Sequence, residues 1–176
     1  RRQPHPASRP KRHRRGGGLL SGTISGDMTL GALADLGADL TEIEHQLQKF
    51  PIEPFKIEQK GVIKKGIYSQ KVEVVTDPDT PPVHHRHYST IKKMIEESQI
   101  SDRAKQLALK IFEPIARAEA KIHNTSVDKV HFHEVGAIDS IVDIVGVALA
   151  LEQLNIDQVI SSPVVVGSGS IHIDHG

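Results

Sequence analysis

The sequence HFHEVGAIDSIVDIVG concentrates side chains that can bind a metal ion or transfer a proton. In an extended strand, His131 and His133 project to the same face, and Glu134 lies at the turn that follows. Asp139 and Asp143 are four residues apart, so they share one face of the helix predicted after this turn. Two imidazoles and up to three carboxylates can therefore converge. Such a nitrogen and oxygen donor set suits nickel, zinc, manganese or iron.

A purely structural interpretation of the same residues is also open. The histidines could be packed and hydrogen-bonded, with the two aspartates marking the solvent side of the helix. One helical face, however, consists only of acidic or small residues, namely Asp139, Asp143, Gly146 and Ala150. An ordinary solvent face would carry Lys and Glu instead. The residues alone leave a lined site and a structural role equally open.

A second candidate is the small-residue loop SGTISGDM, which contains Ser25, Gly26 and Asp27. Its glycines allow backbone N–H groups to face an anion at a helix N-terminus, which favours a phosphate-binding role. The loop has no Walker lysine, so ATP-type phosphate chemistry is not indicated. The alternative is a glycine-rich helix cap in which Ser25 or Asp27 is the N-cap residue.

Further histidines are secondary candidates for a metal site. His84, His85 and His87 occupy a proline-rich loop, where a short histidine tract can bind metal weakly or simply be solvated. His172 and His175 lie in GSGSIHIDHG, which is a poor dinucleotide fingerprint because no helix follows it. The chain has no cysteine, which excludes thiolate ligands and disulfides.

The elements that must position these residues follow from hydrophobic periodicity and from Gly and Pro positions. The helix carrying Asp139 and Asp143 is apolar on most sides, so we expect it to be central. A capping box of Thr41 and Glu44 opens an earlier helix. We predict helices over residues 28–36, 41–50, 89–98, 101–123 and 137–154, and strands over 55–63, 67–75, 130–133 and 159–166. The helix over 101–123 should bury Leu107, Ile111 and Ile115.

This alternation predicts an α/β fold, with a mixed sheet flanked by helices and a disordered basic tail over residues 1–18. The domain proper is expected over 19–176. Residues 1–15 carry seven Lys or Arg and no acid, so residues 16–176 hold 15 basic and 22 acidic side chains. Such an acidic body, with aromatic residues at 3%, argues against nucleic-acid binding. No apolar run is long enough for a membrane span, so we expect a soluble, cytoplasmic protein.

Four segments together resemble the N-terminal domain of the LarC family of nickel insertion proteins. They are SGTISGDMTLGALADLG, the loop of His84 to His87, KVHFHEVGAIDSIVDIVG and SSPVVVGSGSIHIDHG. The resemblance runs from about Ser21 to Gly176. It implies a cyclometallase of the lyase class that inserts nickel into pyridinium-3,5-bisthiocarboxylic acid mononucleotide, with CTP consumed, to make the nickel-pincer cofactor of lactate racemase.

The resemblance also implies partners. CTP binding is attributed to a C-terminal domain of the family, so we expect a truncated domain that needs this domain or a separate subunit, and that could form homo-oligomers. Within the domain we expect Glu134 and Asp139 to be catalytic, with Glu134 as a base. His131, His133 and Asp143 are expected to hold the metal, and Ser25, Gly26 and Asp27 to bind the substrate phosphate. The alternative functions are a non-catalytic nickel-binding or delivery domain and an inactive gene fragment.

Overall fold

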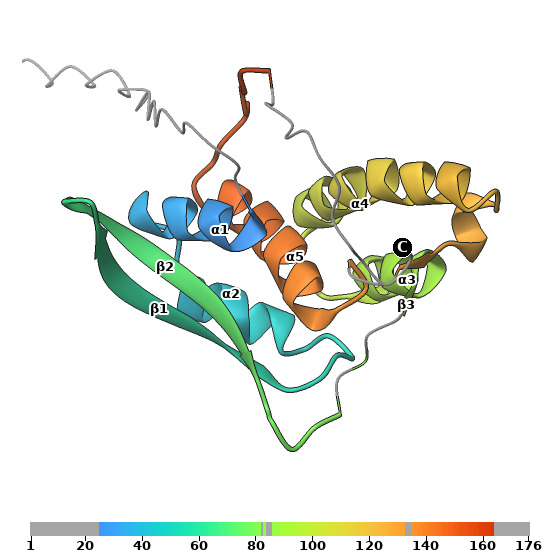
Figure 1. The fold of residues 1–176 in the computed structure, drawn as a ribbon, viewed down its shortest axis with the longest axis horizontal. Helices are drawn as coiled ribbons and strands as arrows, with labels where there is room; N and C mark the ends of the chain where they lie inside the picture. The colour runs from blue at the N-terminus through green and yellow to red at the C-terminus, as the bar shows by residue number, and fades with distance from the viewer. Residues whose placement is uncertain (1–24, 82, 84–85, 133–134, 164–176) are drawn as a thin grey trace, which may run out of the picture. The chain divides into compact units, whose positions relative to one another are not determined.

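The computed structural model describes residues 25–81, 83, 86–132 and 135–163 (Figure 1). The expected combination of helices and strands is confirmed, and the described strands form two separate antiparallel pairs. The predicted tail over 1–18 lies outside the described residues. So does the end of the strand predicted over 159–166; its described part, residues 159–163, is not a strand, and this part of the prediction was wrong. Val159 and Ile160 are exposed there, and none of the described strands pairs with them.

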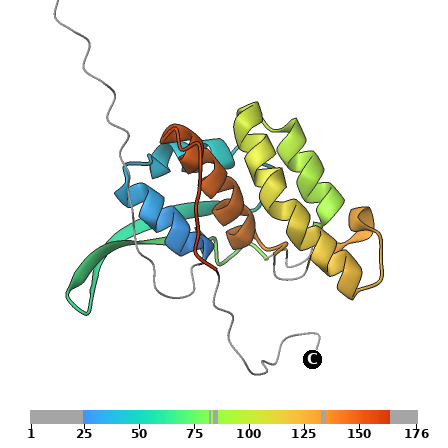
Figure 2. The same ribbon diagram turned by 90° about the horizontal axis from the view of Figure 1, so that it is seen from above.

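Helix α5 (Ile138–Gln153) is the central element, as predicted. Eight of its residues are buried, which follows from apolar side chains on most of its circumference. Helices α1 (Gly26–Asp35) and α2 (Leu40–Leu47) pack against it on one side, and α4 (Asp102–Ile122) packs on the other (Figures 1 and 2). Helix α3 (Tyr88–Glu97) lies against α4. The aspartates on α5 are thus carried by the most enclosed helix described.

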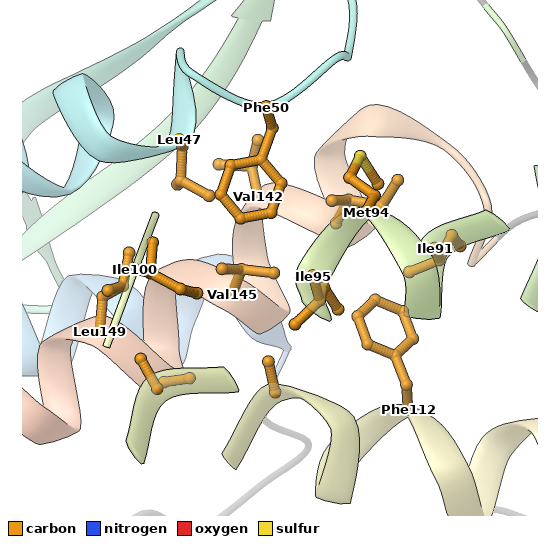
Figure 3. Packing of buried hydrophobic residues seen from close by; sticks show 14 of the residues in the cluster. Leu47, Phe50, Ile91, Met94, Ile95, Ile100, Phe112, Val142, Val145 and Leu149 are labelled. Carbon is orange, nitrogen blue, oxygen red and sulfur yellow. The ribbon is translucent and has the colours of Figure 1, made fainter. Parts of the chain in front are cut away.

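The core is continuous across α5. In Figure 3, Val142, Val145 and Leu149 of α5 lie between Leu47 and Phe50 on the α2 side and side chains from α3 and α4. Each of these three side chains is at most 2% exposed. Burial of this kind stabilises a fold by about 25 cal/mol per Å² of apolar surface, so α5 contributes strongly to the stability of the core.

Helix α4 begins where predicted but buries a different face. Ser101 is its N-cap, and the Ser101 hydroxyl accepts a hydrogen bond from the Ala104 N–H at 3.0 Å. The predicted buried stripe of Leu107, Ile111 and Ile115 is only partly buried. The buried stripe instead consists of Ala104, Ala108, Phe112, Ala116 and Ala120. Small side chains at four-residue spacing let neighbouring helices approach closely, and a search for large apolar residues misses them.

The predicted capping box at α2 was wrong. Asp39 is the N-cap, and its carboxylate accepts hydrogen bonds from the backbone N–H groups of Thr41 and Glu42 at 3.0 and 3.1 Å. Glu44 is therefore not needed for capping. Its carboxylate accepts the Ile57 N–H at 2.5 Å and so ties α2 to the first strand.

The hairpin of β1 (Phe55–Lys64) and β2 (Ile67–Thr76) confirms the predicted pair. The strands are antiparallel, from Phe55 opposite Thr76 to Lys64 opposite Ile67. Strand β2 packs on α1, and β1 on α2. A second pair joins β3 (Arg86–His87) to β4 (His131–Phe132), so that His87 lies opposite His131. This short pair brings the end of the proline-rich segment, Arg86 and His87, next to His131 and Phe132.

Candidate functional site

Three carboxylates from two helices converge where α1 and α5 begin. Asp27 lies in the first turn of α1, and Asp139 lies in the first turn of α5 with Asp143 one turn later. The Asp27 and Asp139 carboxylates are both close enough to raise the pKa of Asp143 electrostatically. We call these three residues the carboxylate cluster. It combines residues from two regions that the sequence had singled out separately.

Asp143 is the most perturbed acid of the carboxylate cluster. Burial first, and then repulsion by Asp27 and Asp139, raise its pKa to about 6, although a hydrogen bond from the Asp27 backbone N–H opposes this. Its Oδ1 atom is buried and has no hydrogen-bond partner among the described residues. An unpartnered buried oxygen is costly, about 1–3 kcal/mol. The arrangement is one that a bound cation would relieve.

Because α1 packs closely on α5, Asp143 lies against the start of α1. A Cβ atom on Gly26 would lie 2.5 Å from Oδ2 and 2.6 Å from Cβ of Asp143, so only glycine fits. Further along α5, Gly146 and Ala150 are buried, and Gly146 faces Leu30 and Ile43. Two causes therefore explain the small and acidic face of α5. Its small residues allow neighbouring helices to pack closely, and Asp143 faces the beginning of α1.

The loop predicted to bind phosphate forms the start of α1. Ser25 is the N-cap by position, but its hydroxyl donates to the Asp27 carboxylate and makes no hydrogen bond to the helix backbone. The Ser25 carbonyl accepts the Thr29 N–H at 3.0 Å and the Thr29 hydroxyl at 2.9 Å. The Asp27 carboxylate and its two acidic neighbours surround this helix start with negative charge. Phosphate binding at Ser25, Gly26 and Asp27 stays a prediction.

The structure joins His87 to His131, which the sequence had placed in different candidate groups. Their rings stack with centroids 4.6 Å apart and an interplanar angle of 19°. The β3–β4 pairing fixes this arrangement because the two residues are directly opposite each other. Two imidazoles from segments far apart in the sequence therefore lie against each other.

Several predicted site residues lie outside the described residues: His133, Glu134, His84, His85, His172 and His175. Within the described ranges, no three His, Asp or Glu side chains are grouped closely enough to hold a metal ion. The metal and catalytic roles predicted for His131, Asp139 and Asp143 therefore stay predictions. The described structure contributes the carboxylate cluster and the stacked pair of His87 and His131.

One residue that the sequence analysis missed connects this region to the rest of the fold. Arg86, only 10% exposed, forms an ion pair with Glu53, which is 9% exposed. It also donates to the Gly136 carbonyl at 2.7 Å, just before α5 begins. Burial raises the pKa of Glu53, but hydrogen bonds from its own backbone N–H and that of Val83, together with Arg86, lower it overall. The sequence signal for this contact is the arginine within PVHHRHY, a segment in which only the histidines were considered as site residues.

The described site thus consists of a carboxylate cluster at the N-termini of two helices and a stacked pair of histidines. The family model described as "Nickel insertion protein" matches residues 20–176. The chain belongs to the nickel insertion protein family. This confirms the resemblance seen in the sequence.

Relatives are similar over most of this chain. A protein of Geobacillus kaustophilus named "Pyridinium-3,5-bisthiocarboxylic acid mononucleotide nickel insertion protein" is 48% identical over 160 residues, covering 87% of this chain and 39% of its own length. Proteins with the same name are 47% identical in Staphylococcus epidermidis, over 87% of this chain and 38% of theirs. A protein of the same name in Akkermansia muciniphila is 43% identical, over 89% of this chain and 40% of its own length.

The chain thus spans about two fifths of the length of these curated relatives. No solved structure matches it. None of the helices in the described ranges has the length and apolarity that a membrane crossing requires.

Proposed function

We propose that this domain takes part in inserting nickel into pyridinium-3,5-bisthiocarboxylic acid mononucleotide. The observation that carries the proposal is the half-buried Asp143, whose pKa is raised to about 6 and whose Oδ1 has no partner among the described residues. Strongly perturbed pKa values are concentrated at functional sites, where a bound cation would compensate such a carboxylate. The names of the relatives supply the chemistry: nickel as the ion and a pyridinium mononucleotide as its acceptor.

In this proposal the carboxylate cluster binds Ni²⁺ before transfer, together with His131 and His133. Carboxylate and imidazole donors suit a divalent first-row metal, and they bind it less tightly than thiolates would, which favours release to the substrate. Nickel–sulfur bonds form to the two thiocarboxylates, and a nickel–carbon bond forms at the ring as that carbon loses a proton. Glu134 is the base that accepts this proton, and Asp139 is the second catalytic carboxylate.

The wider reaction follows from the family resemblance. We propose that the product is the nickel-pincer cofactor of lactate racemase, and that CTP is consumed at a C-terminal domain that acts with this one. The same domain acting without catalysis, as a nickel-delivery module, is the alternative. Adding CTP, the pyridinium substrate and a relative's C-terminal domain in trans distinguishes them: nickel transfer that needs all three components supports insertion, and transfer that ignores CTP supports delivery.

The direct test is a calorimetric Ni²⁺ titration of the wild-type chain and Asp143→Asn. We expect at least a tenfold loss of affinity in Asp143→Asn because one anionic ligand is removed while side-chain volume is kept. Asp35→Asn is the matched control, since Asp35 ends α1, is exposed and lies outside the carboxylate cluster. A His131→Ala/His133→Ala double variant tests the imidazole contribution. Equal affinity of wild type and Asp143→Asn would show that nickel is not bound at this cluster.

A further inference from the structure

The outer edge of β1 has no partner among the strands that the structure describes. In those ranges β1 pairs with β2 alone, so its other edge presents backbone N–H and C=O groups without a strand beside them. On the opposite edge of the hairpin, β2 is covered by α1: a Cβ atom on Gly31 would lie 2.7 Å from the Gln70 carbonyl oxygen. The far end of the hairpin projects away from the helices in both views (Figures 1 and 2). An edge of this kind can accept a further strand.

A contact between β1 and α2 shows which backbone groups point outward. The Ile57 N–H donates to the Glu44 carboxylate at 2.5 Å, so it points away from β2. Inward and outward backbone groups alternate along an antiparallel strand. The N–H and C=O groups of Gln59, Gly61 and Ile63 therefore also point outward, beyond the part of the edge that α2 covers.

The geometry of the hairpin turn leads to the same assignment. Lys65 and Gly66 both have positive φ, 50° and 80°, as a two-residue turn of this hairpin type requires. Lys64 and Ile67, which flank such a turn, exchange hydrogen bonds with each other. Even-numbered residues of β1 thus bond to β2, and odd-numbered residues face outward.

The free end of the hairpin also exposes large apolar side chains. Phe55 and Val72, nearer the helices, are 6% and 1% exposed on the inner face. Further out on the same face, Ile63 and Tyr68 are opposite each other and are 74% and 60% exposed. A Cβ atom on Gly61 would lie 2.5 Å from the Tyr68 hydroxyl oxygen, so the tyrosine side chain lies across this glycine. An apolar face therefore continues beyond the helices that cover its first half.

We propose that this edge of β1 pairs with the same edge of a second copy of the chain. The two β1 strands run antiparallel about a two-fold axis at Gly61, so that Gln59 of one copy lies opposite Ile63 of the other. Their outward N–H and C=O groups then bond to one another, and the two hairpins form one four-stranded sheet. Ile63 and Tyr68 of both copies meet on one face of this sheet. The inference is independent of the proposed nickel function.

Charge complementarity selects the second copy and this register. Glu58 lies opposite Lys64 of the second copy, and symmetry gives this pair twice. In the two adjacent registers Lys60 lies opposite either Lys60 or Lys64 of the second copy, and like charges in such positions are destabilising. Among the described residues Lys64 forms no salt bridge, whereas Lys60 is 2.7 Å from Glu58. Pairing stops before Ile57, whose N–H is already bound by Glu44.

The test is sedimentation velocity of the full chain over a range of concentrations. We expect a reversible dimer, and Lys64→Glu should raise its Kd at least about tenfold because two opposite-charge pairs become like-charge pairs. The double variant Glu58→Lys/Lys64→Glu should recover most of this loss, since the pairs are restored with the signs exchanged. Lys110→Glu is the matched control, because it makes the same charge change at an exposed position of α4.

Amide hydrogen exchange of the same samples locates the contact. The amides of Gln59, Gly61 and Ile63 should exchange more slowly as the concentration rises, whereas those of Lys60 and Val62 are protected by β2 at every concentration. A chain that stays monomeric would overturn the proposal, and so would a dimer whose Kd is the same in Lys64→Glu. Protection of the three outward amides that does not depend on concentration would show that the edge is covered within one chain, which also overturns it.

Discussion

Two carboxylates withdrawn from solvent, Glu53 and Asp143, have opposite surroundings. Glu53 meets the Arg86 guanidinium and accepts the Val83 N–H at 2.8 Å, so its pKa is lowered overall despite burial. Asp143 meets two other carboxylates, its pKa is raised to about 6, and its Oδ1 has no partner among the described residues. The first arrangement stabilises the fold. The second destabilises it and, in our account, persists because it serves nickel.

The largest effect should come from breaking the stabilised pair. Arg86→Met leaves the Glu53 carboxylate, which is 9% exposed, with backbone N–H donors but no cation, and it frees the Gly136 carbonyl. We expect a loss of about 3–5 kcal/mol in the free energy of unfolding, measured by urea denaturation. The double variant Glu53→Met/Arg86→Met should be markedly more stable than the single one, because no buried charge is left. Equal losses would show that the ion pair is not what holds this region.

A smaller loss of folding stability should follow from a substitution that crowds Asp143. Gly26→Ala places a Cβ atom 2.5 Å from Asp143 Oδ2, so α1 must shift, and we expect a cost of about 1–3 kcal/mol in thermal unfolding. Gly146→Ala is the control, since its nearest contact is an ordinary 3.4 Å to Leu30. That variant should be neutral or slightly stabilising, because Ala favours a helix over Gly. If both variants behaved alike, the close approach of α1 to α5 would be refuted.

Neutralising Asp143 should raise the free energy of unfolding, whereas the two changes above lower it. Asp143→Asn removes the repulsion by Asp27 and Asp139 and supplies an amide donor for them, so we expect the chain without metal to gain about 1–2 kcal/mol at pH 7.5. Chemical denaturation measures this gain. Asp139→Asn, on an exposed residue of the same cluster, should change stability by less. A destabilised Asp143→Asn would contradict the account.

The same raised pKa predicts a pH dependence of stability. The pKa of Asp143 is about 6 in the folded chain and about 4 when unfolded. Between these values the folded state binds more protons, so the Asp143 contribution to stability falls as pH rises from about 4 to about 6 and is constant above that. The difference in unfolding free energy between wild type and Asp143→Asn should follow this curve. A difference that stays flat from pH 4 to 7 would be inconsistent with it.

The sequence predicted the elements better than it predicted their contacts. Periodicity located α5, the hairpin and the start of α4 because these depend on neighbouring residues. It failed on the buried face of α4, where Ala104 and Ala108 matter through their small size. It also could not pair Asp27 with Asp143, or His87 with His131, since these contacts join distant segments and depend on how the helices and strands pack.

The central claim is that the unfavourable carboxylate cluster exists to bind nickel, and one paired measurement tests it. The unfolding free energy of wild type and Asp143→Asn is measured with and without Ni²⁺ at pH 7.5. Without nickel, Asp143→Asn should be the more stable chain. Nickel at about 100 times its Kd should then stabilise the wild type by about 2.7 kcal/mol and Asp143→Asn by much less, which closes or reverses the gap. Equal stabilisation of both chains by Ni²⁺ would contradict the claim.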